Sequence, residues 1–145
     1  MSELHVVFKV GGMEYAIAAE KVVQMDSFTG ASIVPGAPPY VAGIVQVRGK
    51  VVPVVDLRVR FGLAPAPITI DSRIVVAQDG ARPVALLADS AREVVKLELD
   101  QIEPPPAMIG DEAQGFVKAV VRLGARILMV IDFNKVIGED SLHGQ

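Results

Sequence analysis

The chain has 145 residues, of which 51% are hydrophobic and 21% are charged, so it can bury a core as one domain or as two very small ones. The net charge is −3 and the 14 basic residues form no run, a composition that argues against nucleic-acid binding. The chain has no cysteine, which excludes disulfides and thiolate metal sites within it.

No segment has the pattern of a membrane-spanning helix. Mean hydropathy is high, at +0.43. However, the longest apolar runs, such as Ile127–Ile131, are much shorter than the ~20 residues that a spanning helix needs. Met1–His5 shows neither the basic nor the apolar region of a signal peptide. We therefore expect a cytoplasmic protein without direct membrane insertion, whose surplus apolar side chains serve protein–protein contact.

The N-terminal elements are predicted to be strands. Alternating apolar residues indicate a strand over Leu4–Val10, followed by a turn at Gly11-Gly12 and a return strand over Glu14–Ala18. For Ala18–Met25 we expect a short turn followed by a strand. The next segment is rich in Gly and Pro and is predicted to hold only a short strand and one helical turn, at Ser32–Val34 and Tyr40–Ala42.

The stretch Gly43–Leu63 is predicted to form a β-hairpin followed by a short helix. Its two β-branched strands are joined by a turn at Gly49-Lys50, because Gly accepts the positive φ of tight turns. Pro53 lacks an N–H and therefore belongs at a sheet edge or a bulge. Asp56 stands at the helix N-cap position, and Gly62 stands just past the helix end.

Ala64–Pro67 is predicted to be an extended linker between two halves of similar size, since two of its four residues are prolines. Roughly ten short strands separated by turns favour small barrels over one open sheet. The second half is predicted to contain strands and one capped helix, at Ile74–Ala77, Pro83–Ala88, Arg92–Leu99, Phe116–Leu123, Arg126–Ile131 and Asp132–Gly138.

The two halves end in a similar way. Val54–Leu57 followed by Phe61-Gly62 matches Val130–Phe133 followed by Ile137-Gly138, at a constant offset of 76 residues. One explanation is chance, because a strand, an Asp cap, a short helix and a Gly stop form a common combination. The other is a pair of similarly built β subdomains. The sequence leaves both open.

No constellation of residues points to catalysis, a cofactor or a metal. Phosphate-binding and metalloprotease motifs are absent. His5 and His143 lie near the termini without positioned partners, and we assign them no role. Asp56 and Asp132 are better explained as helix caps than as acids or bases. We therefore predict no catalytic, cofactor-binding or metal-binding residues, with an enzyme of unknown type as an alternative.

Arg48 ends an apolar strand beside Gly49, so its guanidinium is expected to project from a hairpin tip. One explanation is a solvated side chain or a surface salt bridge, which contributes ~0–1 kcal/mol. The other is an interface anchor, because Arg is enriched among the residues that dominate binding energy.

The order of residues in Gly43–Phe61 resembles that of the CheW family of bacterial chemotaxis coupling proteins. The family segment carries a Gly, a strand that ends in Leu-Arg-Gly, a Pro-Val-Val-Asp-Leu-Arg run and a Phe. The corresponding residues here are Gly43, Val47-Arg48-Gly49, Pro53–Arg58 and Phe61. The resemblance extends to the opening hairpin, the next strand, a Pro-rich loop and the closing strand and helix, at Phe8–Ile17, Lys21–Met25, Gln101–Pro106 and Arg126–Ile137.

The chain departs from the family pattern in a few places. Gln46-Val47 replaces Asn-Leu, and Gln24 replaces an acidic residue. Ala85 stands where Gly is common, and Asp89-Ser90 where Asp-Gly is common. These differences leave the expected fold unchanged. They fall near expected contact surfaces, so they bear on which receptor and kinase are the partners.

The resemblance implies an all-β fold of two small five-stranded SH3-like β-barrels that are packed together on a shared apolar core, with short capped helices. The first barrel is expected at about 15–65 and the second at about 70–132, with some exchange of terminal strands. Both belong to a single domain over 1–145, with a polar tail at 139–145.

The resemblance also implies a non-catalytic adaptor without cofactors. Such an adaptor bridges the cytoplasmic tip of methyl-accepting chemoreceptors to the regulatory domain of a CheA-type histidine kinase, and these partners hold it at membrane receptor arrays. One alternative is a coupling protein of a related pathway that controls pilus-driven or gliding motility or gene expression. Another is a small barrel that binds a ligand or nucleic acid.

The family's contacts imply candidate residues for partner binding. A receptor helix is expected in an apolar groove between the barrels, with receptor- or kinase-binding candidates at Val22, Gly43, Arg48, Ile74 and Val94. The kinase-docking side is assigned to Val51, Val52 and Val54. Gly43 is expected to let a partner backbone approach closely. Arg48→Ala or Gly43→Arg is then expected to weaken binding while leaving the fold intact.

Overall fold

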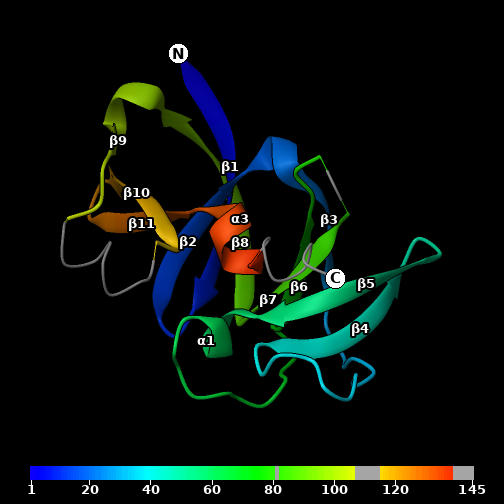
Figure 1. Cartoon of the computed structure of the whole chain (residues 1–145). Coiled ribbons are helices and arrows are strands. Elements are labelled where there is room, and N and C mark those ends of the chain that lie inside the picture. Colours follow the sequence, from blue (N-terminus) through cyan, green and yellow to red (C-terminus); the bar gives the residue numbers. More distant parts are fainter. Residues whose placement is uncertain (81, 107–114, 139–145) are drawn as a thin grey trace.

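The fold consists mainly of short β-strands with a few short helices (Figure 1). It is a computed structural model that describes residues 1–80, 82–106 and 115–138, so the predicted tail and His143 lie outside the described residues. The elements are β1 (Ser2–Val10), β2 (Met13–Ala18), η1 (Ala19–Lys21), β3 (Val22–Ser27), β4 (Val41–Val47), β5 (Lys50–Asp56), α1 (Leu57–Arg60), β6 (Arg73–Ala77), β7 (Val84–Ala88), β8 (Ser90–Glu98), η2 (Leu99–Gln101), β9 (Ile102–Glu103), β10 (Val117–Leu123), β11 (Arg126–Ile131) and α3 (Phe133–Ile137).

The strands form two sheets. One has six strands in the order β8-β1-β2-β11-β10-β9, and the other has five in the order β3-β6-β7-β5-β4. Most neighbours are antiparallel, but each sheet holds one parallel pair, β2 with β11 and β5 with β7. The predicted all-β fold of two small barrels packed together is confirmed, with one sheet for each. One sheet exceeds the expected five strands because β9, only two residues long, pairs with β10.

The chain passes between the sheets in a way that the sequence does not reveal. β1 and β2 pair with strands from the C-terminal half, whereas β6 and β7 pair with β3–β5. The five-stranded sheet therefore takes its strands from Val22–Ala88, and Ala64–Pro67 lies inside that range. The expected division near residues 65–70 differs from these sheet boundaries. Apolar alternation shows which faces are buried but not which strands pair.

Three apolar clusters fill the interior. One contains residues of both sheets, and each sheet also has a cluster of its own. Strand alternation explains the division, because successive side chains point to opposite faces. In β1, Val6 and Phe8 belong to the shared cluster while Val7 belongs to the cluster of the six-stranded sheet. In β5, Val55 faces the shared cluster and Val54 faces the interior of the five-stranded sheet.

Three local predictions near the β4–β5 hairpin are wrong. The turn is Arg48-Gly49 rather than Gly49-Lys50, and both residues have positive φ, 51° and 78°. Positive φ at both positions defines a type I′ turn, whose twist matches that of the strands. Tyr40–Ala42 is not helical, since β4 begins at Val41. Ser32–Val34 is not a strand, because only Ser32 pairs, in an isolated bridge with Ile44.

The similar endings of the two halves are a repeated structure. β4 and β10 each carry a bulge at the equivalent place near the start of the strand. The amide of Asp56 donates to the carbonyl of Tyr40 at 2.7 Å, and the amide of Asp132 donates to that of Phe116 at 2.8 Å. The donors and the acceptors are both 76 residues apart. This agreement favours two similarly built units over chance recurrence.

Candidate functional site

The tip of the β4–β5 hairpin presents Arg48, which is exposed on an extension that reaches away from the body of the fold (Figure 1). Arg48 is the one non-glycine residue with positive φ in the described part of the chain, a conformation that costs ~1 kcal/mol. Its side chain makes no hydrogen bond or ion pair with the described residues. Among the described residues this argues against a surface salt bridge and leaves a solvated side chain or an interface anchor, and backbone strain at an exposed cation favours the anchor.

Val51 extends this tip with an apolar surface, since 68% of it is exposed. It pairs with Gln46, which is also exposed. An exposed cationic side chain and an exposed apolar side chain thus both lie at the end of one hairpin. This combination suits a docking contact, because apolar area and Arg both rank high in interface cores.

Three of the other candidate side chains are buried. Val52, Val54 and Ile74 are 1%, 0% and 4% exposed and lie in the cluster inside the five-stranded sheet. The side chains of Val52 and Val54 are not available at the surface of this structure, whereas Ile74 lines an open pocket beside residues of β3 and β4. The contact role predicted for Val52 and Val54 does not fit this burial, and the role of Ile74 stays a prediction.

The space beside Gly43 is filled by the main chain of this same protein. A Cβ at this position would lie 2.3 Å from the carbonyl oxygen of Ser32, and the φ of Gly43 is +145°. Ser32 approaches because it exchanges two backbone hydrogen bonds with Ile44, at 2.9 and 2.8 Å. The expectation that Gly43→Arg leaves the fold intact is therefore wrong, because even a methyl group would collide with the main chain.

Val22 and Val94 lie on edge strands of different sheets. Val22 begins β3, is half-buried and packs against the shared cluster. Val94 lies in β8, opposite Val6 of β1, and is 51% exposed. Both side chains can contribute to contact with a partner, and their role stays a prediction.

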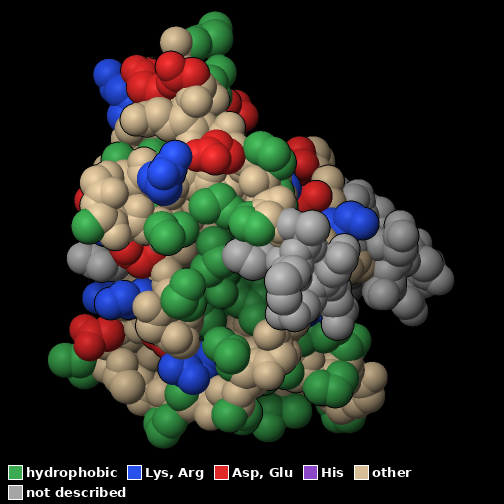
Figure 2. Space-filling view, turned by 90° about the vertical axis from the view of Figure 1, so that its left-hand side faces the viewer, with side chains coloured by type: hydrophobic (Ala, Val, Ile, Leu, Met, Phe, Trp, Pro, Cys, Tyr) green, Lys and Arg blue, Asp and Glu red, His purple; other side chains and the backbone are tan. Residues whose placement is uncertain are grey.

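An apolar surface that the sequence analysis missed lies on the side of β10, β11 and α1. Figure 2 shows hydrophobic side chains gathered in the middle of that side. Met13 and Ile127 are 48% and 54% exposed, on the neighbouring parallel strands β2 and β11. Leu63 is 40% exposed and lies beside the turn at Gly11. Met13 and Tyr15 lie on the same face of β2, so the alternating pattern of the strand could have revealed part of this surface.

Asp89, which matches the family pattern and precedes the departure at Ser90, joins three segments. Its carboxylate accepts hydrogen bonds from Nε and Nη2 of Arg58, each at 2.8 Å, and from the amide of Gly11 at 2.8 Å. Burial alone would raise the pKa of Asp89, but the Arg58 hydrogen bonds, the Gly11 amide and the Arg58 charge together lower it. Asp89 thus fixes α1 and the β1–β2 turn to the β7–β8 junction.

The described residues contain no group of three or more His, Cys, Asp or Glu side chains that could hold a metal ion. Within the same residues, no helix is long and apolar enough to cross a membrane. The geometry is that of two small β-sheets that share a core and expose apolar and cationic contact surfaces. These features define an interaction domain.

Comparison with known proteins identifies the family. The model of the CheW-like domain matches residues 4–141, so the chain belongs to that family. It is 32% identical to the chemotaxis protein CheW of Bacillus subtilis, over 96% of this chain and 89% of the relative. It is 25% identical to the protein FrzA of Myxococcus xanthus, over 90% and 82%. The crystal structure of the scaffolding protein TtCheW from Thermoanaerobacter tengcongensis has a TM-score of 0.84 and 27% identity, over 91% of this chain and 90% of that one.

Proposed function

We propose that this chain is a non-catalytic adaptor that couples methyl-accepting chemoreceptors to the regulatory domain of a CheA-type histidine kinase in bacterial chemosensory signalling. The match of the CheW-like family model to residues 4–141 carries the proposal. The adaptor acts in the cytoplasm and reaches the membrane receptor arrays only through its partners.

The fold supports this role through rigidity. The cluster shared by both sheets packs the two sheets together, and the hairpin tip of Arg48 and Val51 and the edge strands that carry Val22 and Val94 all belong to these sheets. Packed cores of this kind transmit displacements instead of absorbing them. A partner bound at one surface is therefore held in a defined orientation relative to a partner bound at the other.

Binding measurements with the Arg48→Asn variant test the proposal. Asn tolerates positive φ, so the turn is retained while the guanidinium is removed. The purified protein is titrated with a chemoreceptor cytoplasmic fragment and with the kinase regulatory domain from the same organism. We expect at least one affinity to fall by about tenfold, which is the loss typical of removing an interface anchor residue.

The matched control is Arg122→Asn, at a 75% exposed side chain of β10. It should leave both affinities unchanged, and circular dichroism should show both variants folded. If the wild-type protein binds neither partner, the adaptor proposal is wrong. If it binds and the two variants behave alike, only the assignment of Arg48 is wrong.

A second candidate function lies within the same family. It is a coupling protein of a chemotaxis-like pathway that controls pilus-driven or gliding motility or gene expression, and it stays open because a relative of this chain, the protein FrzA, does not carry the CheW name. Deletion of the gene separates the two: loss of swimming chemotaxis supports the first function. Intact swimming with altered surface motility or gene expression supports the second.

A further inference from the structure

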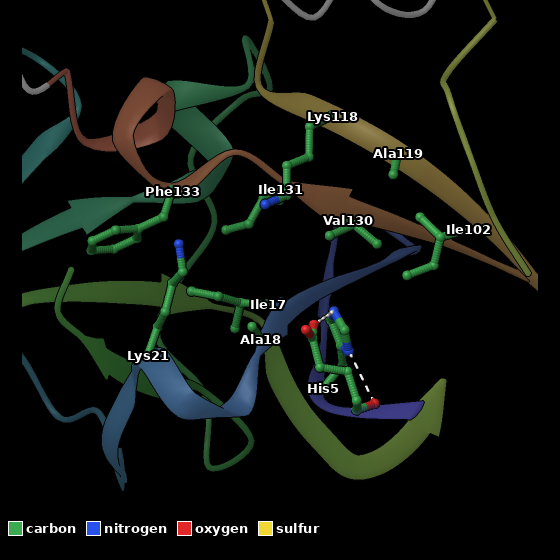
Figure 3. A pocket seen from close by; sticks show the side chains of 11 residues that line it. His5, Ile17, Ala18, Lys21, Ile102, Lys118, Ala119, Val130, Ile131 and Phe133 are labelled. Carbon is green, nitrogen blue, oxygen red and sulfur yellow. Dashed lines mark hydrogen bonds and ion pairs between the residues drawn. The ribbon is translucent and has the colours of Figure 1, made fainter. Parts of the chain in front are cut away.

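A pocket of about 320 Å³ opens in the part of the fold built by the six-stranded sheet (Figure 3). Its lining comes from β1, β2, η1, β9, β10, β11 and α3. This volume lies at the lower end of the range for small-molecule sites, ~300–1,000 Å³. The walls are mainly apolar and include Ile17, Ile102, Val130, Ile131 and Phe133.

Two lysines approach the pocket from different sides. Figure 3 shows the ammonium of Lys21, from η1, directed toward Phe133, and Lys118 descending from β10 toward Ile131. Nζ of Lys21 lies 3.2 Å from a carboxylate oxygen of Asp79, so its charge is partly balanced. Lys118 has no hydrogen bond or ion pair with the described residues. Among the residues that the structure describes, no carboxylate balances Lys118, so this part of the pocket carries positive charge within the described chain.

His5 lines the pocket away from the lysines (Figure 3) and is only 2% exposed. Its contacts are with Glu3 and are long. Nδ1 lies 3.4 Å from the carbonyl oxygen, and Nε2 lies 3.6 Å from the carboxylate. Buried polar groups normally have partners at 2.7–3.2 Å. The imidazole thus keeps capacity for a further polar contact, and the negative charge of Glu3 is on its side of the pocket.

We propose that this pocket binds a small amphipathic carboxylate. The anionic group lies between Lys21 and Lys118. Hydrogen bonds from an ammonium to a carboxylate are charge-assisted and are stronger than those between neutral groups. The apolar part lies against Ile17, Val130 and Ile131. An apolar molecule provides no counter-charge for the two lysines, and a cation is repelled by them. This site goes beyond the adaptor role and does not depend on it.

Hexanoate, 1-hexanol and hexylamine test the charge requirement, because they share an apolar chain and differ in the head group. Each is titrated into the ¹⁵N-labelled protein and followed by NMR up to about 20 mM, well above a millimolar Kd. We expect saturable shifts at His5 and at the lining amides with hexanoate. We expect at least fivefold weaker binding of hexanol and no saturation with hexylamine. Equal binding of hexanoate and hexanol, or no saturation with hexanoate, overturns the proposal.

Lys118→Gln tests the assigned cation. Because Lys118 is exposed and has no partner among the described residues, its replacement should leave the fold unchanged. We expect the affinity for hexanoate to fall at least fivefold. Lys50→Gln, at the start of β5 and outside the pocket lining, is the matched control and should have no effect. If the two variants bind hexanoate equally well, the carboxylate does not lie at Lys118 and the proposal fails.

Discussion

Nε of Arg60 donates a 2.7 Å hydrogen bond to the main-chain oxygen of Val136. Val136 lies 76 residues after Arg60, which is the offset that relates the two repeated units. The same guanidinium lies 4.0 Å from the ring centroid of Tyr40 and 4.9 Å from that of Phe116, which are themselves one offset apart. A further hydrogen bond reaches the main-chain oxygen of Lys135 at 3.1 Å. One side chain at the end of α1 therefore joins both repeated units through the last turn of α3.

Arg60→Lys should lower the free energy of unfolding by about 1–2 kcal/mol. Lys keeps the charge but lacks the planar fork that bonds two carbonyls and stacks on two rings at once. Urea denaturation measures the change. Arg122→Lys is the control, because its exposed pair with Glu103 contributes only ~0–1 kcal/mol and Lys keeps the charge that makes it. Equal losses in the two variants would contradict the bridging role of Arg60.

The repeated caps should contribute similar amounts to stability. The carboxylate of Asp56 accepts from the amide of Arg58 at 3.0 Å, and that of Asp132 accepts from the amide of Lys135 at 3.2 Å. Asp56→Ala and Asp132→Ala should each cost about 1 kcal/mol, and the Asn variants less. Thermal or urea denaturation can compare all four. A loss in only one half would show that the two units are not energetically alike.

The strands and caps were predictable because their signals are local. Alternating apolar residues marked β1 and β2, and the Asp-led, Gly-ended pattern marked α1 and α3. The pairing of β5 with β7, and of β2 with β11, was not predictable. Parallel pairing joins strands that are distant in the chain, and no single stretch of residues records the partner.

The exposed position of Arg48 was also predictable, but the surface role expected for Val52 and Val54 does not fit their burial. Arg48 was expected at a hairpin tip because Gly follows it, and that prediction is confirmed. Transferring positions from a family pattern does not consider on which face of a strand each side chain lies. Alternation would have separated Val51 from Val52 and Val54, because an exposed Val51 places both of the others on the opposite face.

Gly43→Ala should destabilise the protein by about 2–4 kcal/mol. The added methyl group adds a collision with Ser32 to the strain of a positive φ. Gly12→Ala is the matched control, because its φ is +82° but no atom lies within 4 Å of the new Cβ. It should cost only about 1 kcal/mol. If chemical denaturation gives equal losses, the approach of Ser32 has no energetic weight.

The pair of Asp89 and Arg58 should make stability dependent on pH in acid. The folded-state pKa of Asp89 is lower than the ordinary value of about 3.9, so below that value the unfolded chain binds more protons. The stabilising contribution is therefore fully present above about pH 4–5 and is lost as the pH falls through the folded-state pKa.

Asp89→Asn should remove this contribution. Compared with the wild type, the variant should be less stable at pH 7 and should lose stability less steeply between about pH 4 and pH 2. Urea midpoints measured across that range provide the comparison, with Asp71→Asn at an exposed position as the control. Parallel pH profiles for Asp89→Asn and the wild type would mean that the carboxylate has no net favourable interaction.

The strain at Arg48 leads to the most discriminating prediction about function. Arg48→Gly relieves the positive φ of 51° and should raise the free energy of unfolding by up to about 1 kcal/mol. The same change removes the exposed guanidinium, so it should weaken partner binding by about tenfold. A residue retained for structure would not show these opposite effects.

Urea denaturation and titration with the receptor and kinase fragments should be run on one preparation, with Lys50→Gly as the control. A variant that gains stability and binds both partners as the wild type does would place the anchor elsewhere, with Val51 as the next residue to replace.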